Sequence, residues 1–322
     1  MNLRAPLACL LLWLSAGAAM GAGRSAGSAA LIIGKLPVGT RAMALGGAYT
    51  AMADDPSAVW WNPACLARIN GTMAGVNHVE QGQDVRMENA LFAWPVVSGG
   101  SLGLGASYLG MPPIQAQLED PLTGKYLGPG PMVSIYQWKG AAGFGQYLSR
   151  WGDLPLLGPL WSRGAFGASV AVLGEQVGKE GSYSVSIDVG YLYDDPALGR
   201  RFGLVARELG APSRGAPLPV TGQMGVAQEL GSWTISADVL TATDDSYRVR
   251  GGVEWTYEGK GGVASLRVGA QHSFSSHINS WLSMGLGYTL TLPGSMEASI
   301  DYSFLPVDMF EDMHAVSIEV AL

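Results

Sequence analysis

The chain is poor in cysteine and in charged residues. It has two cysteines in 322 residues, and only 14% of its residues are Asp, Glu, Lys or Arg. Cys9 belongs to an apolar N-terminal stretch, so Cys65 is the single thiol of the rest of the chain and an internal disulfide is excluded. A formal net charge of −7 argues against nucleic acid as a partner, because such a protein needs a basic face.

A long unbroken apolar helix is lacking as well. The stretch 89–118 has no charged residue and is long enough to cross a bilayer as a helix. Pro95, Pro112 and Pro113 would break that helix, and unsatisfied backbone groups are costly in hydrocarbon. Residues 101–108 instead alternate between small side chains and larger apolar or aromatic ones, which predicts a strand.

Motifs for catalysis or metal binding are also missing. The histidines His78, His272, His277 and His314 show no metal-ligand spacing. No Gly-x-Ser-x-Gly nucleophile motif lies between a predicted strand and a predicted helix, and acidic pairs such as Asp54-Asp55 lack the alternating oxygen ligands of a calcium loop. We therefore expect neither an enzyme nor a bound metal or cofactor.

The N-terminus has the pattern of a secretory signal peptide. Arg4 precedes an apolar run at 7–14, and small residues follow at 15–22. Cleavage is expected after Ala18, Gly21 or Ala22, so residues 1–22 are predicted to be the signal peptide of an exported protein.

What the chain has in abundance is glycine and aromatic residues. It contains 46 Gly, 10 Trp and 12 Tyr. Its mean hydropathy of +0.19 is high for a soluble protein and low for a helical membrane protein. Transmembrane β-barrels lie between these classes, because half of their strand residues face water.

Alternation with a period of two is the strongest pattern in the sequence. In 296–304, Met, Ala, Ile, Tyr and Phe alternate with Glu, Ser, Asp and Ser. Similar alternation occurs at 183–191, 249–257, 282–288 and 316–322. The segments are long enough to cross a bilayer as tilted strands and carry aromatic residues near their ends, which favours a transmembrane barrel over a soluble sandwich.

Counting these segments predicts fourteen antiparallel strands within residues 70–322. They begin near 71, 86, 101, 132, 163, 181, 200, 218, 232, 246, 263, 280, 294 and 312. With an even count both ends lie in the periplasm, and 110–131 and 306–312 become extracellular loops. The connection 149–162, with Trp151 and Trp161, is then unusually long for the periplasmic side.

Charged residues on the polar faces of these strands are candidates to line the lumen. Two roles are open: selectivity for a passing solute, or pairing across neighbouring strands. The candidates are Arg248, Arg250, Glu254, Arg267, Glu297 and Asp301.

Residues 23–69 differ from the rest and are predicted to form a short helical segment inside the barrel, the plug segment. Ala-rich residues 41–53 predict one short helix. Asp55 is expected to cap a second helix with Pro56 at its first position, and Asn62-Pro63 to end it. Gly46 and Gly47 would permit close approach to the wall.

This segment resembles the N-terminal signature of PorV/PorQ-type outer-membrane proteins, relatives of the FadL-like barrels. The match covers Arg41-Ala42, Gly46-Gly47-Ala48, Ala53-Asp54-Asp55, Ser57-Ala58 and Trp61-Asn62-Pro63-Ala64, whereas Cys65 stands where the family usually has Gly. The resemblance implies a fourteen-stranded barrel and a plug or hatch motif that fills or gates the lumen. The implied motif residues are Arg41, Gly46, Gly47, Asp54, Asp55, Trp61, Asn62 and Pro63.

The resemblance also implies two alternative functions in the bacterial outer membrane. PorV-like proteins act in type IX secretion, which implies a scaffold that docks exported cargo and secretion machinery through outward loops such as 110–131. FadL-like proteins admit hydrophobic compounds, which implies an uptake channel for a hydrophobic small molecule. The ionic inward faces argue against a wide apolar channel, so the scaffold is favoured; outer-membrane lipid is a partner in both cases.

Overall fold

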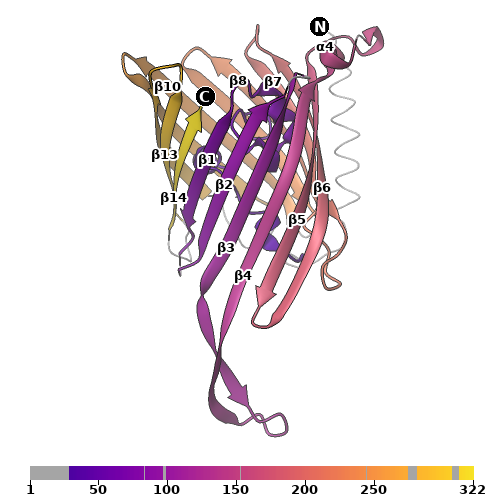
Figure 1. Ribbon diagram of the computed structural model, residues 1–322, viewed down its shortest axis with the longest axis vertical. Helices are drawn as coiled ribbons and strands as arrows, with labels where there is room; N and C mark the ends of the chain where they lie inside the picture. The colour runs from indigo at the N-terminus through magenta and orange to yellow at the C-terminus, as the bar shows by residue number, and fades with distance from the viewer. Residues whose placement is uncertain are drawn as a thin grey trace.

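The protein is a closed barrel of fourteen antiparallel strands. In the computed structural model, residues 29–82, 84–96, 99–152, 154–243, 245–274, 281–306 and 312–322 are described. Each strand pairs with its neighbours in sequence, and β1 pairs with β14 to close the wall (Figure 1). The predicted fold class and strand number are confirmed. The predicted signal peptide, 1–22, lies outside the described residues.

The strands are β1 (Met73–Glu80), β2 (Arg86–Pro95), β3 (Gly100–Glu119), β4 (Tyr126–Tyr147), β5 (Gly164–Val177), β6 (Glu180–Asp195), β7 (Arg200–Gly210), β8 (Thr221–Leu230), β9 (Trp233–Ala242), β10 (Asp245–Gly259), β11 (Gly262–Ser273), β12 (Trp281–Thr291), β13 (Glu297–Leu305) and β14 (Met313–Ala321). The short helices are η1 (Ile32–Gly34), α2 (Thr40–Ala44), α3 (Ala58–Trp61), η2 (Pro63–Arg68), η3 (Leu148–Trp151), η4 (Pro155–Leu157) and α4 (Pro159–Ser162).

The two faces of the wall follow the alternation in the sequence. On β13, Ile300 and Tyr302 are exposed on the outside, whereas Asp301 and Ser303 are buried on the inside. An apolar exterior around a polar interior suits a barrel surrounded by lipid. The carboxyl end and the start of β1 lie at one rim, which we take as the periplasmic rim because it carries the tight turns 231–232 and 260–261.

The segment 110–131, predicted to be a loop, instead continues β3 and β4 as a long hairpin. β2 pairs with β3 only as far as Gly110, and β5 pairs with β4 only from Ile135. Beyond these points the hairpin projects alone from the extracellular rim (Figure 1). The ladder shifts register between Met111 and Ile114, where Pro112 and Pro113 cannot donate hydrogen bonds. These prolines hid the strand pattern.

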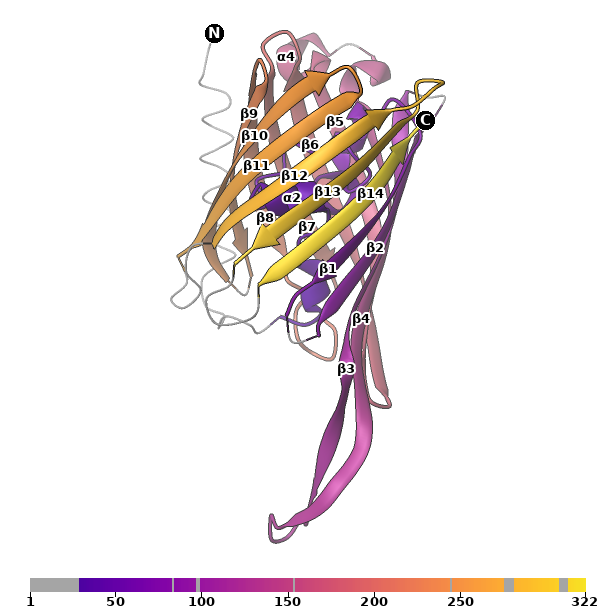
Figure 2. The same cartoon turned by 90° about the vertical axis from the view of Figure 1, so that its left-hand side faces the viewer.

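The described part of the plug segment lies inside the barrel (Figure 2). α2 contacts the wall at β11 to β14, and η2 contacts it at β3 to β6. Tyr49, Met52 and Leu66 are fully buried there, so the hydrophobic core of the molecule is formed by the plug and the wall residues packed against it.

The helices of the plug are shorter than predicted. The first ends at Ala44 rather than near residue 53, because Gly46 and Gly47 adopt positive φ angles of 65° and 77°. The second begins at Ala58 rather than at Pro56, although Asp55 accepts a hydrogen bond from the backbone of Ser57 as a turn residue does.

Glycines in the wall make room for the plug. A Cβ on Gly269 would overlap the backbone of Leu45 and Gly46, and one on Gly167 would overlap Pro63. The same obstruction by plug atoms applies at Gly103, Gly105, Gly145, Gly190, Gly203, Gly252 and Gly285. Glycine inside a strand often marks close approach of another backbone, so the high glycine content reflects in part the seating of the plug.

We expect Gly167→Val to displace the plug while leaving strand pairing intact. Overpacking at such a site costs about 1–3 kcal/mol, so heat-modifiable gel migration should show a lowered transition temperature. Proteolysis should also cut within residues 40–69 more readily. The matched control is Gly140→Val, since a Cβ at Gly140 meets nothing within 4 Å. Equal behaviour of the two variants would contradict the seating described above.

Candidate functional site

Arg41 ties the plug to the barrel wall. Its guanidinium donates to both carboxylate oxygens of Glu254 on β10, with Nε–Oε2 at 2.8 Å and Nη2–Oε1 at 2.7 Å. Its remaining nitrogen, Nη1, lies 2.5 Å from Oδ1 of Asp54 in the plug itself. A bidentate pair of this kind is directional as well as strong, so it sets the position of α2 against the wall.

Glu254 continues this contact into a network along the wall. It also accepts a hydrogen bond from Arg267 Nε at 2.6 Å, and Arg267 pairs in turn with Asp301 on β13. We call Arg41, Asp54, Glu254, Arg267 and Asp301 the ionic anchor. Charges of opposite sign alternate along it, so that each buried charge has a partner; a buried charge without one would be strongly destabilising.

Arg68, near the other end of the plug segment, contacts the plug residues around Asp54. Its Nη1 donates to the carbonyl oxygens of Met52 and Ala53 at 2.9 and 3.0 Å. Its other nitrogens lie 3.5 Å from Asp54 and 3.6 Å from Asp194. Burial alone would raise the pKa of Asp54, but the guanidiniums of Arg41 and Arg68 outweigh it and hold that pKa below its ordinary value. Asp54 is therefore charged at neutral pH.

Asp238 on β9 is a second attachment point that the sequence patterns did not single out. Its Oδ2 accepts hydrogen bonds from the backbone of Tyr49 and Thr50, from the Thr50 hydroxyl and from Gln223, at 2.8–3.0 Å. The only signal for it was an Asp at a polar-face position of a strand, a feature shared by many residues of this chain.

The other motif residues make contacts both within the plug and with the barrel wall. Asn62 donates to the carbonyl oxygens of Thr50 and of Tyr191 on β6, at 3.0 and 3.2 Å, and caps η2, where Pro63 is the first residue. Trp61 donates to Val38 at 2.7 Å, and Asp55 accepts from the Tyr49 hydroxyl. Gly47 offers its carbonyl oxygen to Arg250 at 3.3 Å.

The six predicted lumen residues are not one group. Glu254, Arg267 and Asp301 come together in the ionic anchor. Arg248 and Arg250 lie farther toward the extracellular rim and border a cavity. Glu297 starts β13 at the periplasmic rim, where it is exposed and pairs in the ladder with Ala321.

A further buried ion pair lies at a bulge in the wall and was also missed from the sequence. The ladder of β6 and β7 shifts between Ile187 and Val189, and Glu208 there has a positive φ of 59°. Glu208 pairs with Lys139 and accepts from Ser186 at 2.9 Å. The Lys139 ammonium lies 4.4 Å from the ring centre of Trp60, so this pair also contacts the plug.

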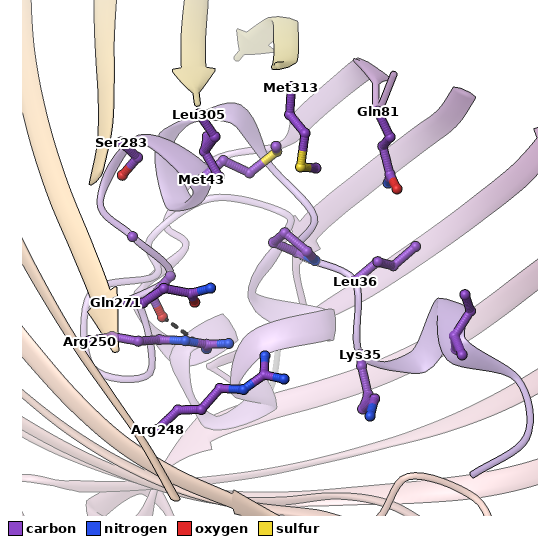
Figure 3. A pocket seen from close by; sticks show the side chains of 14 residues that line it. Lys35, Leu36, Met43, Gln81, Arg248, Arg250, Gln271, Ser283, Leu305 and Met313 are labelled. Carbon is purple, nitrogen blue, oxygen red and sulfur yellow. Dashed lines mark hydrogen bonds between the residues drawn. The ribbon is translucent and has the colours of Figure 1, made fainter. Parts of the chain in front are cut away.

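A cavity of about 250 Å³ lies between the plug and the wall toward the extracellular rim. Met43, Leu305 and Met313 gather on one side of it, and Lys35, Arg248 and Arg250 on the other (Figure 3). It is further bordered by Ile32, Leu36, Pro37, Gly46, Gly47, Gln81, Gln271 and Ser283. The cavity is thus apolar at one end and cationic at the other.

Within the described ranges, no three His, Cys, Asp or Glu side chains form a group that could bind a metal ion. In the same residues, no helix is both long and apolar enough to cross a membrane.

Three solved structures are similar in fold to this chain. The toluene transporter TodX of Pseudomonas putida has a TM-score of 0.57 and 12% identity, over 88% of this chain and 97% of that chain. A FadL homologue of Pseudomonas aeruginosa has a TM-score of 0.58 and 10% identity, over 89% and 98%. The monoaromatic hydrocarbon channel CymD has a TM-score of 0.58 and 12% identity, over 91% and 97%.

No protein-family model and no curated protein matches the sequence. At these low identities, the similarity to the solved structures concerns the fold. The PorV/PorQ-type resemblance and a role in type IX secretion receive no support from the comparisons. The comparisons therefore show that this chain shares the fold of these three proteins.

Proposed function

We propose that this protein is an outer-membrane channel that admits small hydrophobic compounds. The observation that carries the proposal is the cavity between the plug and β10 to β14. Its apolar side, with Met43, Leu305 and Met313, offers contacts to a hydrocarbon group. Ligand sites are typically concave and mostly apolar with a few placed polar groups, and this cavity fits that description.

The position of the cavity supports entry from outside the cell. It lies at the extracellular ends of the strands, on the extracellular side of the ionic anchor, and residues 32–37 of the plug segment border it. A compound held there is separated from the periplasm by the plug. Passage therefore requires the plug to shift, and the ionic anchor and Asp238 are the contacts that resist such a shift.

The ionic residues of the lumen do not oppose this function. Glu254, Arg267 and Asp301 are occupied by one another and by Arg41. They leave the cavity wall at Leu305 and Met313 apolar. The ionic residues on the polar strand faces are therefore no argument against the passage of an apolar compound.

A secretion-associated scaffold is the second candidate. The long β3–β4 hairpin favours it, because Leu118, Leu122 and Leu127 are exposed on a projecting ribbon. The similar structures named above are described as a transporter, a FadL homologue and a hydrocarbon channel, and these descriptions support uptake as the first candidate.

Filling the cavity should slow uptake. We expect Met313→Trp to reduce uptake of radiolabelled toluene or of a fatty acid roughly tenfold or more, since a misfit in such a pocket costs about 1–3 kcal/mol. The control is Val316→Trp on the same strand, whose side chain faces outward. If cells carrying Met313→Trp take up both compounds at the same rate as the control and the wild type, the cavity is not on the path.

Weakening the ionic anchor should open the pore. In Arg41→Met, Asp54 keeps Arg68 and Glu254 keeps Arg267, so the wall should persist while α2 loses its attachment. Loss of a charged hydrogen bond of about 1.5–3 kcal/mol should raise the open population about tenfold or more, seen as planar-bilayer conductance. Arg214→Met removes an exposed pair with Glu180 and should change nothing. Equal conductance in all three proteins would contradict gating by the plug.

Shortening the hairpin separates the two candidate functions. Replacing residues 112–130 by a short Gly/Ser linker should leave uptake unchanged, because no residue of the hairpin borders the cavity. Loss of co-purifying exported protein with normal assembly would favour the scaffold, and lost uptake would show that the hairpin takes part in the channel.

A further inference from the structure

The connection between β4 and β5 is far longer than the other periplasmic connections. It spans residues 148–163 and contains η3, η4 and α4. Neighbouring connections on that rim, such as 196–199 and 231–232, are tight turns. Figure 1 shows α4 at the periplasmic rim, projecting beyond the wall next to β5 and β6. We call residues 148–163 the foot.

The foot is attached to the outer surface of the wall. Trp151 packs on Phe166, with ring centres 6.3 Å apart, and Phe166 faces outward on β5. The Tyr191 hydroxyl, also on an outward position, donates to the carbonyl oxygen of Leu160 at 2.7 Å. Gln146 is only 5% exposed, and its Oε1 accepts a hydrogen bond from Trp151 Nε1 at 2.6 Å. The foot therefore covers part of the wall that would otherwise meet lipid.

Apolar side chains of the foot point away from the protein. Leu156 is 91% exposed, and Trp151, Leu154, Leu157 and Leu160 are each more than a third exposed. Exposed apolar groups gathered in this way mark a contact with a membrane or a partner. Here the patch continues through Phe166 into the apolar outer surface of the barrel wall, the outer belt. The patch is therefore expected to face lipid, as the outer belt does.

The ends of the foot carry cations. Arg150 stands beside Trp151, and Arg163 follows α4 and pairs with Asp195. Leu and Trp bracketed by Arg is the composition of segments that lie in the boundary between lipid headgroups and acyl chains. Arginine guanidiniums at that depth suit the phosphates of phospholipids.

We propose that the foot lies in the inner leaflet of the outer membrane, with Leu154, Leu156, Leu157 and Leu160 among the upper acyl chains. It is a lipid-binding element that fixes the depth of the barrel next to β5 and β6. This role does not depend on the compound that the channel admits. It requires only that the outer belt faces lipid.

A site-specific fluorescent label tests the proposal. The full chain with Cys9→Ser and Leu156→Cys is labelled with the environment-sensitive dye NBD and reconstituted in vesicles of phosphatidylethanolamine and phosphatidylglycerol. Cys65 is fully buried and does not compete for the label. The matched control is Leu122→Cys at the tip of the β3–β4 hairpin, where the leucine is 96% exposed.

We expect the label at position 156 to be blue-shifted and quenched several-fold more by lipids with a shallow nitroxide than by aqueous iodide. The label at 122 should show the reverse. Equal iodide quenching at both positions would overturn the proposal, because it would place the foot in water. Protection at 156 that requires added periplasmic proteins would overturn it too, in favour of a protein partner.

Discussion

Backbone hydrogen bonding in a medium without water is the constraint on which this structure depends. An unpaired N–H or C=O group in hydrocarbon costs several kcal/mol, about what many whole domains gain on folding, so an open sheet edge is not tolerated there. The ladder from Met73↔Ala321 to Glu80↔His314 removes the last edge by joining β14 to β1. The unpaired edges of the β3–β4 hairpin occur only beyond the extracellular rim, where water can serve them.

Closing the wall creates a lumen, and most of the inward side chains are explained by how that lumen is filled. Glycines such as Gly167 and Gly269 leave room for the backbone of the plug, and the ionic anchor with Asp238 holds it. The buried charges of the ionic anchor are tolerated because they are matched, Glu254 by two arginines and Arg267 by two carboxylates. The polar faces of the strands therefore bind the plug, and are not only a lining for a passing solute.

Filling is incomplete beside Met43 and Met313, and the proposed function rests on the cavity there. The ionic inward faces suggested a wet lumen unsuited to apolar compounds. That interpretation treated Glu254 and Asp301 as facing open space, whereas the plug and neighbouring strands enclose them. The open cavity beside Met43 and Met313 combines an apolar end with a cationic one. The prediction of a secretion role depends on the resemblance of the plug segment to PorV/PorQ-type proteins, and the fold comparisons give no further support for that role.

The barrel, the fourteen strands and the helical segment before them could be predicted from the sequence, because a period of two is a local consequence of strand geometry in a wall with lipid on one side. Two predictions were wrong for local reasons. Prolines interrupt the alternating pattern of the β3–β4 hairpin, so a loop was predicted there, and Gly46 and Gly47 end the first helix earlier than predicted. Only tertiary structure decided which charges meet, where the cavity lies and that the foot packs on the outer wall. Arg41 and Glu254 are 213 positions apart, and nothing near either residue encodes that contact; it exists because closure brings β10 beside the plug.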